Sequence, residues 1–242
     1  MIPARPLNSF FPVGALLRGE TATIAEWITG WTAGRTAQQI LTIVAGAGAF
    51  GAAMGSWRAP EQALWSAVKL PFVLLGTAAG NALLNGMLAP LLGVELRWRE
   101  TLAAVLTSFT LAAAILGAFS PLMIFLVWNL PPPAPGASVA VAAHSVLLLT
   151  LVGAIAFAGV TANVRLWQLL QRLGAGAASA LRLLFAWLTV NLLLGSQLSW
   201  IARPFIGKAD IPVHFTDPHA LDGNFFEEVA RAAVELWAHF FR

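Results

Sequence analysis

A run of 64 consecutive residues, Thr101 to Val164, contains no Asp, Glu, Lys or Arg. A helix that crosses the hydrocarbon core of a bilayer needs about 20 mostly apolar residues, so this run is long enough to cross it twice. The Pro-rich sequence at 129–136 (NLPPPAPG) predicts a turn between the two crossings. The run therefore predicts a polytopic membrane protein.

The other gaps between charged residues predict three further crossings. Charged residues make up only 10% of the chain, against roughly 25% in a typical soluble domain. In lipid, a helix satisfies its own backbone hydrogen bonds segment by segment. We therefore predict an all-α membrane helix bundle with five transmembrane helices and short interfacial amphipathic helices. Its parts are an N-terminal segment 1–35, a transmembrane domain 36–202 (spans near 36–57, 70–94, 102–128, 138–164 and 183–202) and a tail 203–242.

The basic residues predict the direction of the spans. Eight arginines fall in the N-terminal segment and in the second and fourth loops, whereas four Arg or Lys residues flank the spans on the opposite side. The positive-inside rule then places the N-terminus in the cytoplasm and the tail outside, as in a multi-pass protein of a bacterial inner membrane. Tryptophans near the expected span ends are typical of the aromatic belt at the headgroup level.

Two segments before the second span are predicted to lie at the membrane surface. Apolar residues at i, i+3, i+4 and i+7 indicate a short amphipathic helix before the first span (Ile24, Trp27, Ile28, Trp31). Segment 58–69 is predicted as a second surface helix, with Pro60 at its first helical position. Pro71 would then begin the second span, where its missing N–H costs little.

The tail is predicted to end in an amphipathic helix near 225–240. Asn224 and Glu227 have the spacing of a capping box, which predicts the helix start. Charged residues gather on one side of this helix and apolar residues on the other. We expect the rings of Trp237 and Phe240 to contact the protein or the membrane interface.

Small residues at four-residue spacing mark two of the predicted spans. Gly51 and Gly55 lie in the first span, and Gly76 and Gly80 lie in the second. Such spacing lets helix backbones approach closely in a membrane. It fits packing within the protomer and also fits a self-association face.

Polar residues form one stripe in the second span, where Thr77, Asn81 and Asn85 fall at i, i+4 and i+8. Two interpretations are open. The stripe could hydrogen-bond to a neighbouring helix, or it could line a polar path at the axis of a homo-oligomer. Further intramembrane polar residues, interpreted as hydrogen-bonding, are His144, Asn191 and Gln197.

The sequence offers little reactive chemistry. In the tail, the residue types of His214, Asp217, His219 and Asp222 could bind zinc, but the surrounding prolines and the Asp-Gly dipeptide favour a surface turn. We therefore predict no metal site, no cofactor and no catalytic residues, since no nucleophile or phosphate-loop motif is present. The formal charge of +3 does not indicate a nucleic-acid partner.

Several short motifs are similar to those of a known family. Lys69-Leu-Pro71, Ala89-Pro90-Leu-Leu-Gly93, the segment 195–207 (GSQLSWIARPFIG) and the segment 222–228 (DGNFFEE) resemble an uncharacterised family of bacterial five-span membrane proteins with Yip-like topology. The resemblance covers about residues 60–230. It implies a fold and a topology but no biochemical activity. The positions that match are Arg203, Pro204, Phe205, Gly207, Asn224, Phe225, Phe226 and Glu227.

The motif after the last span has a physical interpretation. Arg203 can reach lipid phosphates or tail carboxylates, Pro204 ends the helix and Phe205 can anchor at the interface. With Lys69 these residues are predicted interface anchors, and ligand binding is the alternative. The expected function is a non-enzymatic assembly or scaffold subunit whose partners are the lipid bilayer and a second copy or other membrane subunits. The alternative is a homo-oligomeric channel or passive pathway for ions or small solutes.

Overall fold

The computed structural model describes residues 13–30, 32–92, 97–172, 176–217 and 219–241, and within them the chain is helical without strands. The predicted all-α class is therefore confirmed. Five helices are long and apolar enough to cross a membrane, namely α3, α4, α5, α6 and α7. The helices are α1 (Val13–Arg18), α2 (Thr21–Thr29), α3 (Ala33–Gly55), α4 (Pro60–Leu91), α5 (Trp98–Asn129), α6 (Ser138–Arg172), α7 (Ala177–Ile201) and α8 (Phe225–Phe241).

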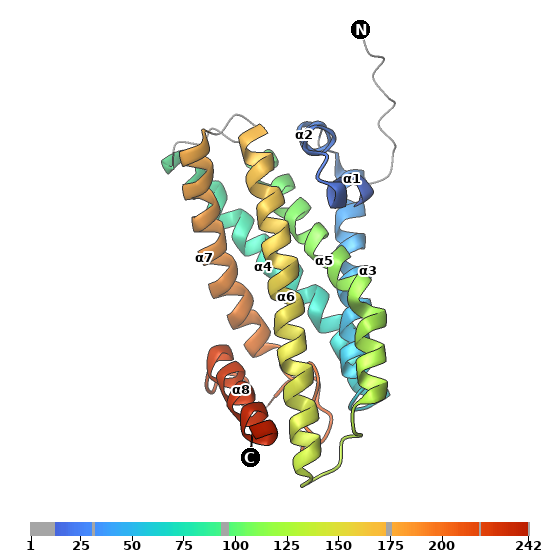
Figure 1. The fold of residues 1–242 in the computed structure, drawn as a ribbon. Helices are drawn as coiled ribbons and strands as arrows, with labels where there is room; N and C mark the ends of the chain where they lie inside the picture. Colours follow the sequence, from blue (N-terminus) through green and yellow to red (C-terminus); the bar gives the residue numbers. More distant parts are fainter. Residues whose placement is uncertain (1–12, 31, 93–96, 173–175, 218, 242) are drawn as a thin grey trace.

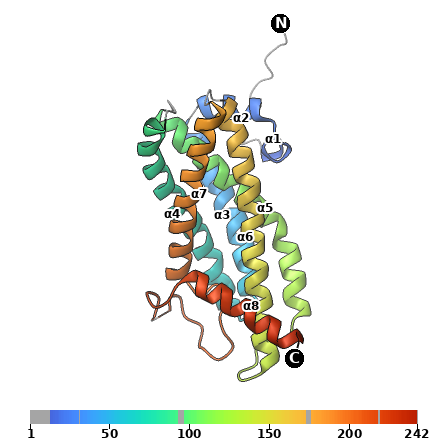
Figure 2. The same cartoon turned by 60° about the vertical axis from the view of Figure 1, so that its left-hand side comes forward.

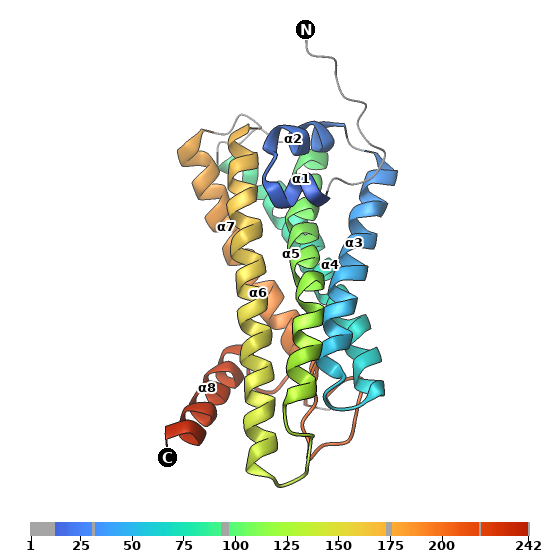
Figure 3. The ribbon, with the colours of Figure 1, turned by 45° about the vertical axis from the view of Figure 1, so that its right-hand side comes forward.

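The five long helices run side by side as one bundle (Figure 1). Helix α3 packs mainly on α4 and α5, α7 packs on α4, and α6 packs on α5. The short helices α1 and α2 lie at one end of the bundle, whereas α8 and the tail lie at the other (Figure 3). An odd number of crossings requires this separation of the two ends.

The predicted apolar stripe before the first span is confirmed as the buried face of α2. Ile24, Trp27 and Ile28 are buried, and α2 packs on the ends of α5 and α6. Trp31, the fourth residue of the stripe, lies outside the described residues. The apolar residues that predict the helix are therefore the ones whose burial holds α2 against the bundle.

The small residues of α3 allow direct contact between backbones. A Cβ atom added at Gly51 or Gly55 would lie less than 3.0 Å from the carbonyl oxygen of Ser66 or Gln62 in α4. In the second pair, a Cβ at Gly80 would lie 2.7 Å from Leu194 of α7. Gly76 faces α7 as well. Gly51, Gly55 and Gly80 therefore serve packing within the protomer, whereas Gly76 is exposed, so self-association through that position stays a prediction.

Helix α4 corrects the prediction for segment 58–69. That segment is not a separate surface helix, because α4 begins at Pro60 and continues without interruption to Leu91. Pro71 lies inside the helix, where it leaves the Ala67 carbonyl without its usual partner. Membrane helices tolerate such a proline when neighbouring helices cover the freed group. Gly48 of α3 lies against this carbonyl, since its added Cβ would be 3.2 Å from the Ala67 oxygen.

Candidate functional site

One polar face of α4 holds the backbone of the tail. The Gln62 amide donates to the carbonyl oxygens of Pro204 at 2.8 Å and Phe205 at 3.2 Å. The Ser66 hydroxyl also donates to the Phe205 carbonyl, and the Lys69 ammonium donates to the Pro204 carbonyl at 3.0 Å. Because these donors lie three or four residues apart, they share one helix face. They bring the chain after the last span back across the end of α4.

Arg58 extends this contact to the next part of the tail. Its guanidinium donates to the carbonyl oxygens of Lys208 at 3.0 Å and Ile211 at 3.1 Å. Gly207 makes the close approach possible, because its φ of 84° suits glycine and an added Cβ would lie 3.0 Å from the Arg58 side chain. The matched glycine of the Arg-Pro-Phe-Ile-Gly motif thus has a structural role.

The sequence predicted Lys69 to be an interface anchor. The structure instead places its side chain inside the bundle, where the residue is only 3% exposed. It follows the start of α4 by nine residues, which is about 14 Å along the helix. Besides the Pro204 carbonyl, its ammonium faces the ring of Phe215, 5.0 Å from the centroid. A buried cation needs such partners, and the tail supplies them to this lysine.

Arg203 is the centre of the tail turn. Its guanidinium donates to the Asp217 carboxylate at 3.1 Å and stacks over the Trp200 ring, 3.7 Å from the centroid. Four backbone carbonyls accept its remaining hydrogen bonds, those of Trp200, His219, Ala220 and Asp222. Arg203 therefore anchors the tail itself. Pro204 and Phe205 contribute their carbonyls to the contact with α4.

The acidic and histidine residues of the tail serve the same turn. Asp217 accepts a hydrogen bond from the backbone N–H of His219 at 2.8 Å. This bond, helped by Arg203, holds the pKa of Asp217 below its usual value. The His219 ring lies 3.2 Å from Asp222, and His214 is exposed. Among the described residues, no three His, Asp or Glu side chains could share a metal ion.

A cavity of about 550 Å³ lies between this tail and helices α4, α6, α7 and α8. Figure 2 shows α8 crossing the ends of the long helices below α7 and beside α6. The volume falls within the usual range of about 300–1,000 Å³ for ligand sites. One wall is apolar and belongs to α6, with Leu148, Leu151, Val152 and Ile155. The tail end is polar, with His144, Arg58, Arg203, Lys208, Asp217, Asp222, Glu227, Glu228 and Arg231.

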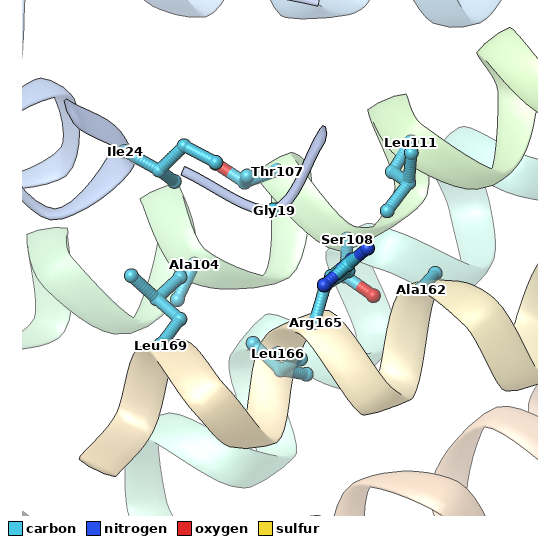
Figure 4. A pocket seen from close by; sticks show the side chains of 10 residues that line it. All are labelled: Gly19, Ile24, Ala104, Thr107, Ser108, Leu111, Ala162, Arg165, Leu166 and Leu169. Carbon is cyan, nitrogen blue, oxygen red and sulfur yellow. The ribbon is translucent and has the colours of Figure 1, made fainter. Parts of the chain in front are cut away.

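A second pocket, at the opposite end of the bundle, is too small for a ligand. Its volume is about 10 Å³, which is near the minimum for one water molecule. Figure 4 shows the Arg165 side chain together with Ser108 and Gly19 among the residues that line this pocket. The Arg165 side chain uses the space that Gly19 leaves, and it donates to Gln168 at 3.1 Å.

The stripe of Thr77, Asn81 and Asn85 is buried between helices of one protomer. The Asn81 amide donates to Asn191 of α7, and the Asn85 amide donates to Asn81. The Thr77 hydroxyl donates to the Val73 carbonyl of its own helix at 2.7 Å. The interpretation as interhelical hydrogen bonding is supported. The stripe does not line an axis between protomers, because α7 covers it.

We expect Asn81→Leu to destabilise the contact between α4 and α7. The change removes the bond to Asn191 and leaves the Asn85 amide with only the Asn81 backbone carbonyl as acceptor, at a cost of about 1–2 kcal/mol. Thermal unfolding in a mild detergent should show the loss as a lower melting temperature. Asn163→Leu is the matched control, because the Asn163 amide donates only within its own helix, to Gly159. Equal melting temperatures for the two variants would contradict the role of Asn81.

Helix α8 starts where the sequence predicts, and Trp237 on it is mostly exposed. The Asn224 side chain accepts the backbone N–H of Glu227 at 3.0 Å, so the cap is present. Ala232 is buried against the bundle, whereas Trp237 is 66% exposed. Trp237 lies about 140° around the helix from Ala232, so most of its side chain lies outside the contact between α8 and the bundle. Contact with the membrane interface stays a prediction, and the side chain of Phe240 lies outside the described residues.

The fold and composition define a multi-pass α-helical membrane protein. Comparisons with protein-family models, curated proteins and solved structures give no match. The candidate site therefore consists of what the chain itself shows: an amphipathic cavity at one end of the bundle, closed by a tail that α4 and Arg203 hold in place.

Proposed function

We propose that the protein is a non-enzymatic subunit of a membrane assembly, joined to its partner through the outer half of α7. The observation that supports this is the open surface of α7. Its buried residues are Ala180, Leu183 and Trp187. None of the residues 188–201 is buried, although the helix has the length and hydropathy of a span.

The exposed surface of α7 carries a polar group that a partner helix would satisfy. Gln197 is exposed, between the exposed Leu193 and Ile201. In an isolated protomer its amide would meet lipid near the end of the span, where donors and acceptors are scarce. A glutamine that bonds across a helix interface is a common device in membrane assembly. The partner is a second copy of this chain or another membrane protein.

Site-specific photo-crosslinking in native membranes tests the proposal. A benzophenone side chain placed at Leu193 should give a crosslinked product, whose mass identifies a second copy or another protein. The matched control is the same group at Phe72 of α4, which is also highly exposed but lies on a different helix. Gln197→Leu should reduce the yield at Leu193 by about threefold, the effect of one interhelical hydrogen bond. Equal yields at Leu193 and Phe72, or none at either, would overturn the proposal.

The direction of the chain belongs to the same proposal. The distribution of basic residues supports an inner-membrane protein with α1 and α2 at the cytoplasmic face and with the tail and α8 outside. The resemblance to five-span proteins of Yip-like topology supports the same arrangement. A cysteine placed at Gly223 should then react with a membrane-impermeant reagent in intact spheroplasts. The reaction is easily interpreted, because the chain has no native cysteine.

A further inference from the structure

The cavity under the tail joins a polar end to an apolar end. Its α6 wall extends from His144 to Ile155, about 16 Å along the helix. The residues from Leu148 inward are apolar. At the far end Ile155 is 37% exposed. The apolar end therefore continues onto the outer surface of α6, which faces hydrocarbon in a membrane.

The polar end carries balanced charge. Four basic and four acidic residues line it, and most of them are already paired. Lys208 and Arg231 both contact Glu228, each at 3.2 Å, and Arg203 pairs with Asp217. A strongly anionic or cationic ligand would face similar numbers of attractive and repulsive groups here.

Arg58 and Glu227 in this lining form no ion pair with another side chain among the described residues, whereas Asp222 lies 3.2 Å from the His219 ring. The Arg58 guanidinium contacts only backbone carbonyls, through two of its five N–H groups. Glu227 is engaged only through its backbone N–H, at the start of α8. The cavity therefore offers an unpaired cation at Arg58 and an unpaired anion at Glu227. This pair matches a zwitterionic group, with a phosphate toward Arg58 and an ammonium toward Glu227.

We propose that the cavity binds a phospholipid from the surrounding bilayer, with a zwitterionic headgroup of the phosphoethanolamine type at the polar end. One acyl chain lies along Leu148, Leu151 and Ile155. The other chain stays in the leaflet, against the exposed apolar surface of α6. The binding energy of the acyl chain comes from burial of apolar surface, and selectivity comes from the two unpaired charges. This proposal does not rest on the assembly through α7.

Native mass spectrometry of the full-length protein in mild detergent tests the proposal. Dioleoyl phosphatidylethanolamine or dioleoyl phosphatidylglycerol is added to delipidated protein, and the bound fraction is measured. The wild-type protein should bind one phosphatidylethanolamine and should prefer it to phosphatidylglycerol by about tenfold, the effect of one charge-assisted contact. Equal binding of the two lipids would overturn the assignment of the headgroup.

Two matched pairs of variants locate the site. Val152→Trp fills the cavity and should reduce phosphatidylethanolamine binding at least about tenfold. Val160→Trp changes the same residue type at an exposed position of α6 outside the cavity and should bind like wild type.

Glu227→Gln should lose the preference for phosphatidylethanolamine, whereas Glu61→Gln, at the exposed start of α4, should keep it.

The two pairs are independent readouts. A melting temperature measured for each variant shows whether it folds, and if Val152→Trp does not fold, the Glu227 pair decides. Full binding by a folded Val152→Trp variant would overturn the site. An unchanged preference in Glu227→Gln would overturn the proposed role of Glu227. Loss of the α7 crosslink would leave these results unaffected, so failure of the assembly and failure of lipid binding are distinguishable.

Discussion

Replacing Gly51 with leucine should separate α3 from α4 and lower the melting temperature by about 6–12 °C, from a cost of about 3 kcal/mol. The new Cβ would lie inside the van der Waals surface of the Ser66 carbonyl. That atom belongs to the backbone of α4 and cannot move away by a change of rotamer. Gly55→Leu should have a similar effect, because its Cβ would meet the Gln62 carbonyl.

The control for this prediction is Gly153→Leu. Gly153 lies in the spanning helix α6, and an added Cβ there meets nothing within 4 Å. The substitution is chemically the same and occurs within a span as well, so the difference in helix and membrane propensity between glycine and leucine cannot explain a difference in melting temperature. A melting temperature of Gly51→Leu equal to that of Gly153→Leu would show that α3 and α4 do not touch at this point.

The same contact explains why the tail site depends on α3. Ser66 and Gln62, whose carbonyls receive Gly51 and Gly55, use their side chains to bind the tail at Phe205. If α3 moves away, the polar face of α4 loses its support. We therefore expect the glycine variants to loosen the tail as well as the bundle.

The five spans follow from the sequence because charge and hydropathy decide them locally. The gaps between charged residues predict five helices. The prediction placed the start of α4 ten residues too late, and this is the helix that contains Lys69. A lysine in the sequence indicates the end of a span, since an ionised group in hydrocarbon is costly. The tail removes that cost by placing the Pro204 carbonyl and the Phe215 ring on the ammonium. Those partners are more than 130 residues away, so local pattern does not reveal them.

The tail site was only partly predictable for the same reason. The helix start at Asn224 and the matched Arg203 are local motifs, and both have structural roles. Arg58, Gln62 and Ser66 were missed, although Gln62 and Ser66 lie four residues apart on one face of α4 and Arg58 lies just before its start. The signal that could have revealed Gln62 and Ser66 was a polar stripe in the first turns of α4. Because segment 58–69 was predicted as a surface helix, this stripe was expected to face solvent. The cavity depends on how α6, α7 and α8 meet, and no pattern within one helix specifies that.

Arg203→Lys should release the tail almost as completely as Arg203→Ala. Lysine keeps the charge next to Asp217 but has a single ammonium, whereas the guanidinium reaches a carboxylate and four carbonyls in several directions. Most of those carbonyls would lose their donor in either variant. The turn from Arg203 to Asp222 would then open locally while the transmembrane helices stay folded.

Hydrogen exchange in lipid nanodiscs measures this opening directly. The amides of Asp217, Ala220 and Asp222 donate within the turn, and they should exchange about 100-fold faster in both variants, which corresponds to the loss of about two charge-assisted hydrogen bonds. Arg231→Ala is the control, because this exposed arginine pairs only with Glu228. It should leave those three amides protected. If Arg203→Lys keeps wild-type protection, the positive charge alone holds the turn, and the directional role of the guanidinium is wrong.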